Sequence, residues 1–223
     1  MTLQLGSHFV AFIDILGFSE MVRSDCESSE SPRYLQLLHN SHIRAIGLFG
    51  KDLQSGLIQF SDSIVFSKPF DLGQLEGFLD AIATWQRSLL LDGLLCRGGV
   101  TFGKHFVKDK FLFSKAMIDA YVLENSRARF PRIIVSDDLL QLASSTIQIC
   151  SLKLYKEDDG ATFIDYLRWV KEDEKQELVK AVENITLGAN KLPSSVQEKL
   201  RWLTRYADHT LRTSLSPPQF APV

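Results

Sequence analysis

The sequence lacks the features of secreted, membrane-spanning and strongly charged proteins. Three cysteines in 223 residues are too few and too widely spaced for a disulfide framework or a thiolate zinc site. No apolar run approaches the roughly 18 to 20 residues of a membrane span, and no secretory signal pattern opens the chain. The 25 basic and 27 acidic side chains almost cancel, which excludes a global field for nucleic acid or anionic membranes. We therefore expect a cytoplasmic protein.

The composition that remains is that of a globular protein. With 45% apolar residues, the chain can bury a core without covalent staples. After residue 167 the composition shifts toward lysine and glutamate, and two apolar stripes at helical spacing follow, the second with a capping-box start at Ser195 and Glu198. We expect three segments: a globular domain over residues 1–167, a helical extension over residues 168–213 and a flexible tail over residues 214–223.

The chain begins with a strand pattern followed by a helix pattern. Residues 8–16 are too apolar on both sides for a surface strand and too short for a core helix, so they predict a buried central strand. Residues 24–31 are acidic and serine-rich, which is typical of a loop, and a helix is expected from Pro32 to about Gly50. The apolar side of that helix carries Leu35, Leu38, Ile43 and Ile46.

A hairpin and further alternating elements follow. Residues 57–60 and 64–66 are two short β-rich runs, and the turn between them places Asp62 at its tip. The other expected elements are helices over 75–89 and 115–129 and strands over 94–106, 132–136, 147–155 and 162–166. This order predicts an α+β fold, with a ferredoxin-like, palm-type βαββαβ sheet, helices on one face, and the C-terminal helices appended.

Two aspartates are the first candidates for chemistry. An ionised Asp14 inside the apolar strand would be costly to bury unless it is paired or bound to a metal. The predicted hairpin would bring Asp62 beside that strand, and two carboxylates suit magnesium or manganese. A salt bridge at Asp14 and an ordinary turn aspartate at Asp62 are the alternative interpretations.

A second pair of polar residues lies on a predicted helix. Asn125 and Arg129 are four residues apart, hence on one face, and both donate hydrogen bonds suited to phosphate or ribose oxygens. A solvated polar face is the alternative interpretation. His39 and His42 are the only close histidine pair, and they lack the further ligands of a zinc site.

Together these residues lie in motifs that resemble those of the class III nucleotidyl cyclases. The stretch Phe12-Ile13-Asp14-Ile15-Leu16-Gly17-Phe18 is similar to the first metal motif of that family, and Phe60-Ser61-Asp62 is similar to the second. Arg97-Gly98-Gly99-Val100-Thr101-Phe102-Gly103 resembles the glycine-rich strand. The segment from Asn125 to Arg129, followed by residues 132–136, resembles the asparagine–arginine helix and its next strand. The motifs keep the family's order.

The resemblance implies a mechanism and an assembly. Asp14, Asp62 and the backbone carbonyl of Ile15 would hold two Mg²⁺ or Mn²⁺ ions in one protomer. Asn125 and Arg129 would come from the other protomer of a homodimer with shared active sites, the asparagine against the ribose and the arginine against the reacting phosphate. Such a chain would be inactive as a monomer.

Three further residues are candidates for binding the triphosphate. Gly17 and Phe18 would present backbone N–H groups where a helix begins, although Gly17 is otherwise a simple turn glycine. Arg97 would contact phosphate, and its pairing with a carboxylate at the core edge is an equally good interpretation.

The base is the least constrained part of the substrate. The positions that read purines in the family correspond to Ile58 and Ile118 here, which would leave a purine's polar edges unpaired. His39, Arg44 and Gln59 are conceivable base readers, and no base assignment follows from them.

The motifs look most like the pyrimidine cyclases of the bacterial Pycsar antiphage system. The resemblance implies conversion of UTP to cyclic UMP and diphosphate, yielding a second messenger for antiviral defence. A cytidylate cyclase acting on CTP, a purine cyclase and a catalytically silent nucleotide-binding regulator are the alternatives.

Overall fold

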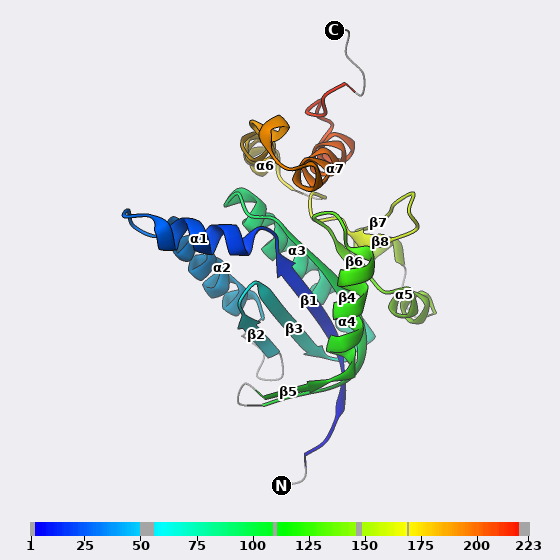
Figure 1. Ribbon diagram of the computed structural model, residues 1–223. Coiled ribbons are helices and arrows are strands. Elements are labelled where there is room, and N and C mark those ends of the chain that lie inside the picture. Colours follow the sequence, from blue (N-terminus) through cyan, green and yellow to red (C-terminus); the bar gives the residue numbers. More distant parts are fainter. Residues whose placement is uncertain (1–2, 50–55, 109–110, 146–148, 169, 219–223) are drawn as a thin grey trace.

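The computed structural model describes residues 3–49, 56–108, 111–145, 149–168 and 170–218 (Figure 1). Its centre is a mixed sheet in the strand order β2-β3-β1-β4-β6-β8-β7, with β5 paired to the far end of β4. The strands are β1 (Gly6–Ile15), β2 (Gly56–Phe60), β3 (Ser63–Pro69), β4 (Cys96–Lys108), β5 (Phe111–Ser114), β6 (Ile133–Val135), β7 (Leu154–Lys156) and β8 (Thr162–Ile164).

Strand β1 is the central strand that its apolar sequence predicts. It runs antiparallel between β3 and β4 and is buried on both faces. Phe9, Ala11 and Ile13 face one core cluster, whereas Val10 and Phe12 face a second cluster on the other side. An alternating polar pattern would leave one of these clusters incomplete, which explains why the segment is apolar throughout.

Helices cover both faces of the sheet, so the expected α+β fold is confirmed but the placement of all helices on one face is wrong. Helices α2 (Arg33–Phe49) and α3 (Leu75–Leu91) pack on one face, and α4 (Lys115–Arg127) packs on the other against β1 and β4 (Figure 1). Gly99 of β4 permits this approach, because a Cβ there would lie 2.5 Å from the carbonyl oxygen of Ala120 in α4.

Several expected boundaries differ in the structure. Helix α1 (Phe18–Glu27) occupies part of the expected loop over 24–31, because the chain turns into a helix directly after Gly17. Of the strand expected over 147–155, residues 147 and 148 lie outside the described residues. Ile149–Leu152 forms a short 3₁₀ turn, and the strand begins only at Leu154.

Of the four residues expected on the apolar side of α2, Leu38 packs against the core and the other three are exposed. Leu35 and Ile43 are 63% and 53% exposed, and Ile46 is exposed as well. Small and aromatic residues face the core instead: the buried residues of α2 are Ser41, Ala45 and Phe49. The indole N–H of Trp85 donates to the Ser41 carbonyl at 3.2 Å, so close helix packing selects a small residue at that position.

Helices α5 (Asp137–Ser144), α6 (Glu172–Thr186) and α7 (Ser194–Leu211) complete the α-helices of the described residues. The α7 start differs from the capping box expected at Ser195, because Pro193 occupies the N-cap and Glu198 pairs with Arg129. Tyr206 of α7 donates to Asp165 at 2.6 Å and accepts from the Leu167 N–H at 3.0 Å, which ties α7 to the sheet. Within the described residues, no helix has the length and apolarity of a membrane span.

Stability should depend on pH through a buried histidine in β4. Burial, with a contribution from the neighbouring His8 ring, lowers the pKa of His105 from 6.5 to about 4. Because the unfolded chain binds this proton more readily, the stabilisation is complete above pH 6.5 and is lost as the pH falls toward 4. We expect the free energy of unfolding to drop by up to about 3 kcal/mol over that window. Chemical denaturation at stepwise pH measures the slope, which His105→Gln should flatten.

Candidate active site

The hairpin tip brings Asp62 to Asp14 at the end of β1. Asp14 pairs in register with Ser63 of β3, the residue after Asp62 in the chain. The N–H of Ile15 donates to the Asp62 carbonyl at 2.9 Å, which joins the β2–β3 turn to the end of the central strand. The two carboxyl side chains are close enough to interact directly, and both are half-buried. The predicted convergence of these aspartates is therefore present in the fold.

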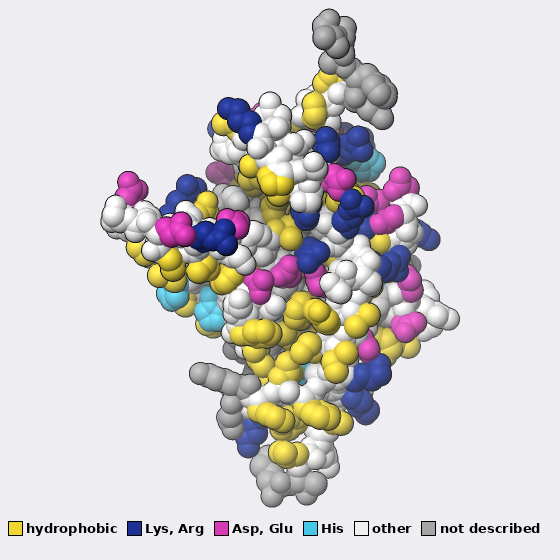
Figure 2. Space-filling model, viewed as in Figure 1, with side chains coloured by type: hydrophobic (Ala, Val, Ile, Leu, Met, Phe, Trp, Pro, Cys, Tyr) yellow, Lys and Arg dark blue, Asp and Glu magenta, His cyan; other side chains and the backbone are white. Residues whose placement is uncertain are grey.

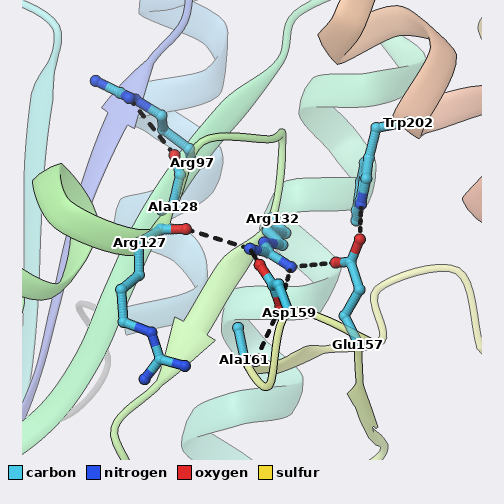
Figure 3. Close-up of polar contacts among 8 residues, drawn as sticks. All are labelled: Arg97, Arg127, Ala128, Arg132, Glu157, Asp159, Ala161 and Trp202. Carbon is cyan, nitrogen blue, oxygen red and sulfur yellow. Dashed lines mark hydrogen bonds and ion pairs between the residues drawn. The ribbon is translucent and has the colours of Figure 1, made fainter.

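Arg97 and Glu124 complete this cluster. Arg97 lies opposite Asp14 in the β1–β4 register, and its Nε is 3.2 Å from Asp14 Oδ2 and 2.8 Å from Glu124 Oε1. Its Nη1 also donates to the carbonyl of Ala128 at 3.5 Å (Figure 3). Of the two interpretations for Arg97, the structure shows the pairing with a carboxylate.

Glu124 was not identified from the sequence, although its position carries a signal. It follows Ala116 and Ala120 at steps of four residues, and those alanines form the buried side of α4. An acidic residue on a buried helix side requires a partner, which Arg97 supplies. Glu124 is 2% exposed, so it lies deeper in the site than either aspartate.

The cluster holds more negative than positive charge. Burial raises the pKa of Asp14, Arg97 opposes that rise, and the Asp62 carboxyl adds to it. Burial likewise raises the pKa of Glu124, again against the effect of Arg97. Asp14 and Glu124 thus share the Arg97 guanidinium, and the Asp62 carboxyl adds a third acidic group beside them. A divalent cation would relieve the repulsion among these carboxyl groups.

The donor set fits a hard cation bound together with a substrate. Among the described residues, no three His, Cys, Asp or Glu side chains are arranged to hold a metal ion by themselves. Two carboxylates are nevertheless the usual protein share of a magnesium site that also uses water and substrate phosphates. Asp14 and Asp62, with the carbonyl of Ile15, are the residues that would hold it.

The turn after β1 leads directly into a helix. Gly17 has a φ of 79°, a left-handed conformation that glycine adopts cheaply, and α1 begins at Phe18. The first N–H groups of a helix have no partner within that helix and attract negative charge. Gly17 and Phe18 therefore stand at the start of a helix, as their predicted phosphate contact requires, and that contact stays a prediction.

Asn125 and Arg129 are both exposed at the surface, each next in sequence to a residue that contacts Arg97. Asn125 is exposed in the last turn of α4, but the helix ends at Arg127, so the expectation that both residues share one helix face is wrong for Arg129. The side chain of Arg129 is 68% exposed and forms an ion pair with Glu198 of α7. Both residues are accessible to a second chain.

The conceivable base readers have local roles. Arg44 forms an ion pair with Asp92, and the Gln59 side chain lies 2.6 Å from Nδ1 of His42. His39 is exposed on α2 and, with Gln59, lines an apolar cavity beneath α1. These contacts do not identify a base-binding residue.

The fold is shared with known adenylyl cyclases. Two structures of a bacterial light-regulated adenylyl cyclase align with TM-scores of 0.51 and 0.50, at 12% and 13% identity, over 82% and 83% of this chain. The alignments cover 57% and 59% of those longer chains. The catalytic core of a rhodopsin-guanylyl cyclase with converted specificity aligns with a TM-score of 0.48, at 14% identity over 71% of this chain and 94% of its own.

Neither a scan against protein-family models nor a search of curated proteins found a match. Because the sequence identities to the two light-regulated adenylyl cyclase structures are only 12% and 13%, the structural likeness establishes the fold alone. The chain has the palm-type fold of the light-regulated adenylyl cyclases, and the acidic cluster lies at the end of its central strand.

Proposed function

We propose that this protein is a metal-dependent nucleotidyl cyclase. The observation that carries the proposal is the convergence of Asp14 and Asp62 in a half-buried, acid-rich site at the end of β1, on a fold shared with adenylyl cyclases. In the reaction, the ribose 3′-oxygen forms a bond to the α-phosphorus. The bond from the α-phosphorus to the oxygen that bridges it to the β-phosphorus breaks, and diphosphate and a proton leave. This chemistry requires alignment and charge neutralisation rather than a protein nucleophile.

The residues of one chain would bind and orient the triphosphate. Asp14 and Asp62 would hold two Mg²⁺ or Mn²⁺ ions per site. When bound, these ions would activate the ribose 3′-hydroxyl and neutralise charge on the phosphates. The N–H groups at Gly17 and Phe18 would bind phosphate oxygens at the start of α1. Arg97 would hold Asp14 and Glu124 in place, a positioning role that its two ion pairs support.

We propose that a homodimer completes the site. Figure 2 shows hydrophobic side chains gathered over α4 and β5, and Asn125 is an exposed residue of α4, four residues after the exposed Tyr121. The exposed apolar residues of these two elements are Phe111, Phe113, Ile118, Tyr121 and Val122. Burying them between two chains would bring Asn125 and Arg129 of one protomer toward the aspartates of the other.

The proposed substrate is a pyrimidine triphosphate, with UTP ahead of CTP. Ile58 and Ile118 are apolar at the positions where the family reads purines, and a purine's polar edge would stay unpaired against them. A purine cyclase agrees equally with the shared fold. In a cellular role like that of the Pycsar enzymes, the cyclic UMP would act as a second messenger in antiviral defence.

One product assay tests the proposal. The purified protein is incubated with Mn²⁺ and each of the four nucleoside triphosphates, and the products are separated by chromatography. Cyclic UMP as the main product supports the full proposal, and cyclic CMP or a cyclic purine nucleotide corrects the base. Absence of any cyclic product, with tight triphosphate binding, would instead identify a silent nucleotide-binding regulator.

A mixing experiment tests the shared site. Arg129→Ala should lower the turnover number by roughly 10²-fold or more, since the arginine would stabilise charge at the transferring phosphate. Asp14→Ala should be inactive by itself. Mixing the two variants should restore part of the activity, because mixed dimers contain one intact site. No restoration in mixtures shown to exchange subunits would contradict the shared arrangement.

A further inference from the structure

A second cavity lies between α7 and the β7–β8 hairpin. It has a volume of about 570 Å³, which is within the usual range for small-molecule sites. None of Asp14, Asp62 and Glu124 lines it, so it is distinct from the acidic cluster. Its inner wall is aromatic and is formed by Phe163, Trp202 and Tyr206, each at most 9% exposed.

The wall of this cavity is held in place by internal contacts. The Trp202 indole N–H donates to Glu157 Oε1 at 2.7 Å, and Figure 3 shows these two side chains pointing toward each other. Phe130 stacks on Trp202 with ring centroids 5.8 Å apart and an interplanar angle of 4°. A cavity with this bracing requires little reorganisation before it binds a ligand.

The charges around the cavity leave an excess of free cations. Lys156, Arg201 and Arg205 line it, all three are exposed, and none has an ion pair with another described residue. Two of the carboxylates that line it are already engaged, Glu157 by Arg132 and Glu198 by Arg129. Asp158 is the remaining carboxylate, so three unpaired cations face one unpaired anion.

We propose that this cavity binds a nucleoside phosphate. Guanidinium groups bind phosphate, as they bind carboxylate, through paired hydrogen bonds, and Arg201 and Arg205 lie four residues apart on one side of α7. The aromatic wall supplies an apolar surface for a base or sugar beside those cations. An inorganic anion would contact the cationic side chains but would make no contact with the aromatic wall.

This inference extends beyond the proposed metal site, because the residues that carry it belong to α7 and the β7–β8 hairpin rather than to the acidic cluster. Of the residues proposed for catalysis, Arg129 also lines this cavity, where it pairs with Glu198. The ligand is either the triphosphate substrate or the cyclic product of the proposed reaction, and both present the same phosphate and nucleoside chemistry. Binding to the cavity does not require the aspartates, so its outcome is separable from the outcome of the cyclase assay.

Calorimetric titration without divalent cations tests the proposal. Full-length protein in EDTA is titrated separately with UTP, cyclic UMP and inorganic triphosphate. We expect saturable binding of one of the two nucleotides, and we expect the double variant Arg201→Gln, Arg205→Gln to weaken it by roughly 10- to 100-fold. Tighter UTP binding would mark a substrate site, and tighter cyclic UMP binding a product site.

The matched control is Lys180→Gln, which removes an exposed positive charge from α6 and does not line this cavity. It should bind like the wild type. The proposal is overturned if the wild type binds neither nucleotide, if the double variant binds as tightly as the control, or if inorganic triphosphate binds as tightly as UTP. Circular dichroism of the double variant checks its fold, and both arginines are exposed, so its folding should be unaffected.

Discussion

Asp62→Asn should reduce cyclic nucleotide formation on the order of 10³-fold while leaving the fold intact. The substitution keeps the backbone carbonyl that accepts from the Ile15 N–H, and it keeps the size of the side chain. It removes a carboxylate that would ligate the metal. Since the Asp62 charge contributes to raising the pKa of Asp14, its loss relieves repulsion, so the melting temperature should stay equal or rise.

The measurement combines product chromatography in Mn²⁺ with differential scanning calorimetry. Asp138→Asn is a matched control, because Asp138 is exposed in the first turn of α5. It should retain wild-type turnover. Turnover of the Asp62 variant above one tenth of wild type, in a folded protein, would contradict a metal-binding role. Asp14→Asn is a less clean test, because it also removes a partner of Arg97.

The central site was predictable because its residues are marked by local contrast. A carboxylate within an apolar strand, as at Asp14, requires a partner, and a hairpin next in sequence restricts where Asp62 can lie. The buried strand β1 follows from its unbroken apolar pattern. These features are determined by residues that are close together in the sequence, so the pattern of apolar and polar residues predicts them directly.

The rest of the site depends on contacts that the local pattern does not express. Arg97 and Glu124 meet only because β4 and α4 pack closely at Gly99, 25 residues before Glu124 in the chain. The end of α4 at Arg127 separates Arg129 from Asn125, and spacing alone predicted a longer helix. Likewise, Leu35, Ile43 and Ile46 of α2 fit the apolar spacing of a helix, but their side chains are exposed and do not face the core.

Arg132→Met should cause the largest loss of stability among single substitutions near these sites. Arg132 is fully buried, and its guanidinium forms ion pairs with Glu157 and Asp159 and donates to the carbonyl of Arg127 at 3.2 Å (Figure 3). Removing it leaves two carboxylates without a counter-charge. Breaking a buried pair costs roughly 3 to 5 kcal/mol, and the partial exposure of both carboxylates favours the lower value.

This loss should also reach the nucleoside-phosphate cavity. Glu157 joins Arg132 to the indole of Trp202, so the β7–β8 hairpin, the end of α4 and α7 are held by one set of contacts. A cost of about 3 kcal/mol corresponds to a fall in melting temperature of roughly 6 to 12 °C for a chain of this size. Calorimetry measures it, and nucleotide titration of the folded variant should show weaker binding.

Arg23→Met is the control for Arg132→Met, because Arg23 forms only an exposed pair with Glu20, in which the two side chains are 60% and 74% exposed. It should change the free energy of unfolding by less than about 1 kcal/mol. A loss below about 1 kcal/mol for Arg132→Met would show that the two carboxylates are solvated independently of it. The hairpin would then be held by its apolar contacts, and Arg132 could not be the residue that fixes the cavity wall.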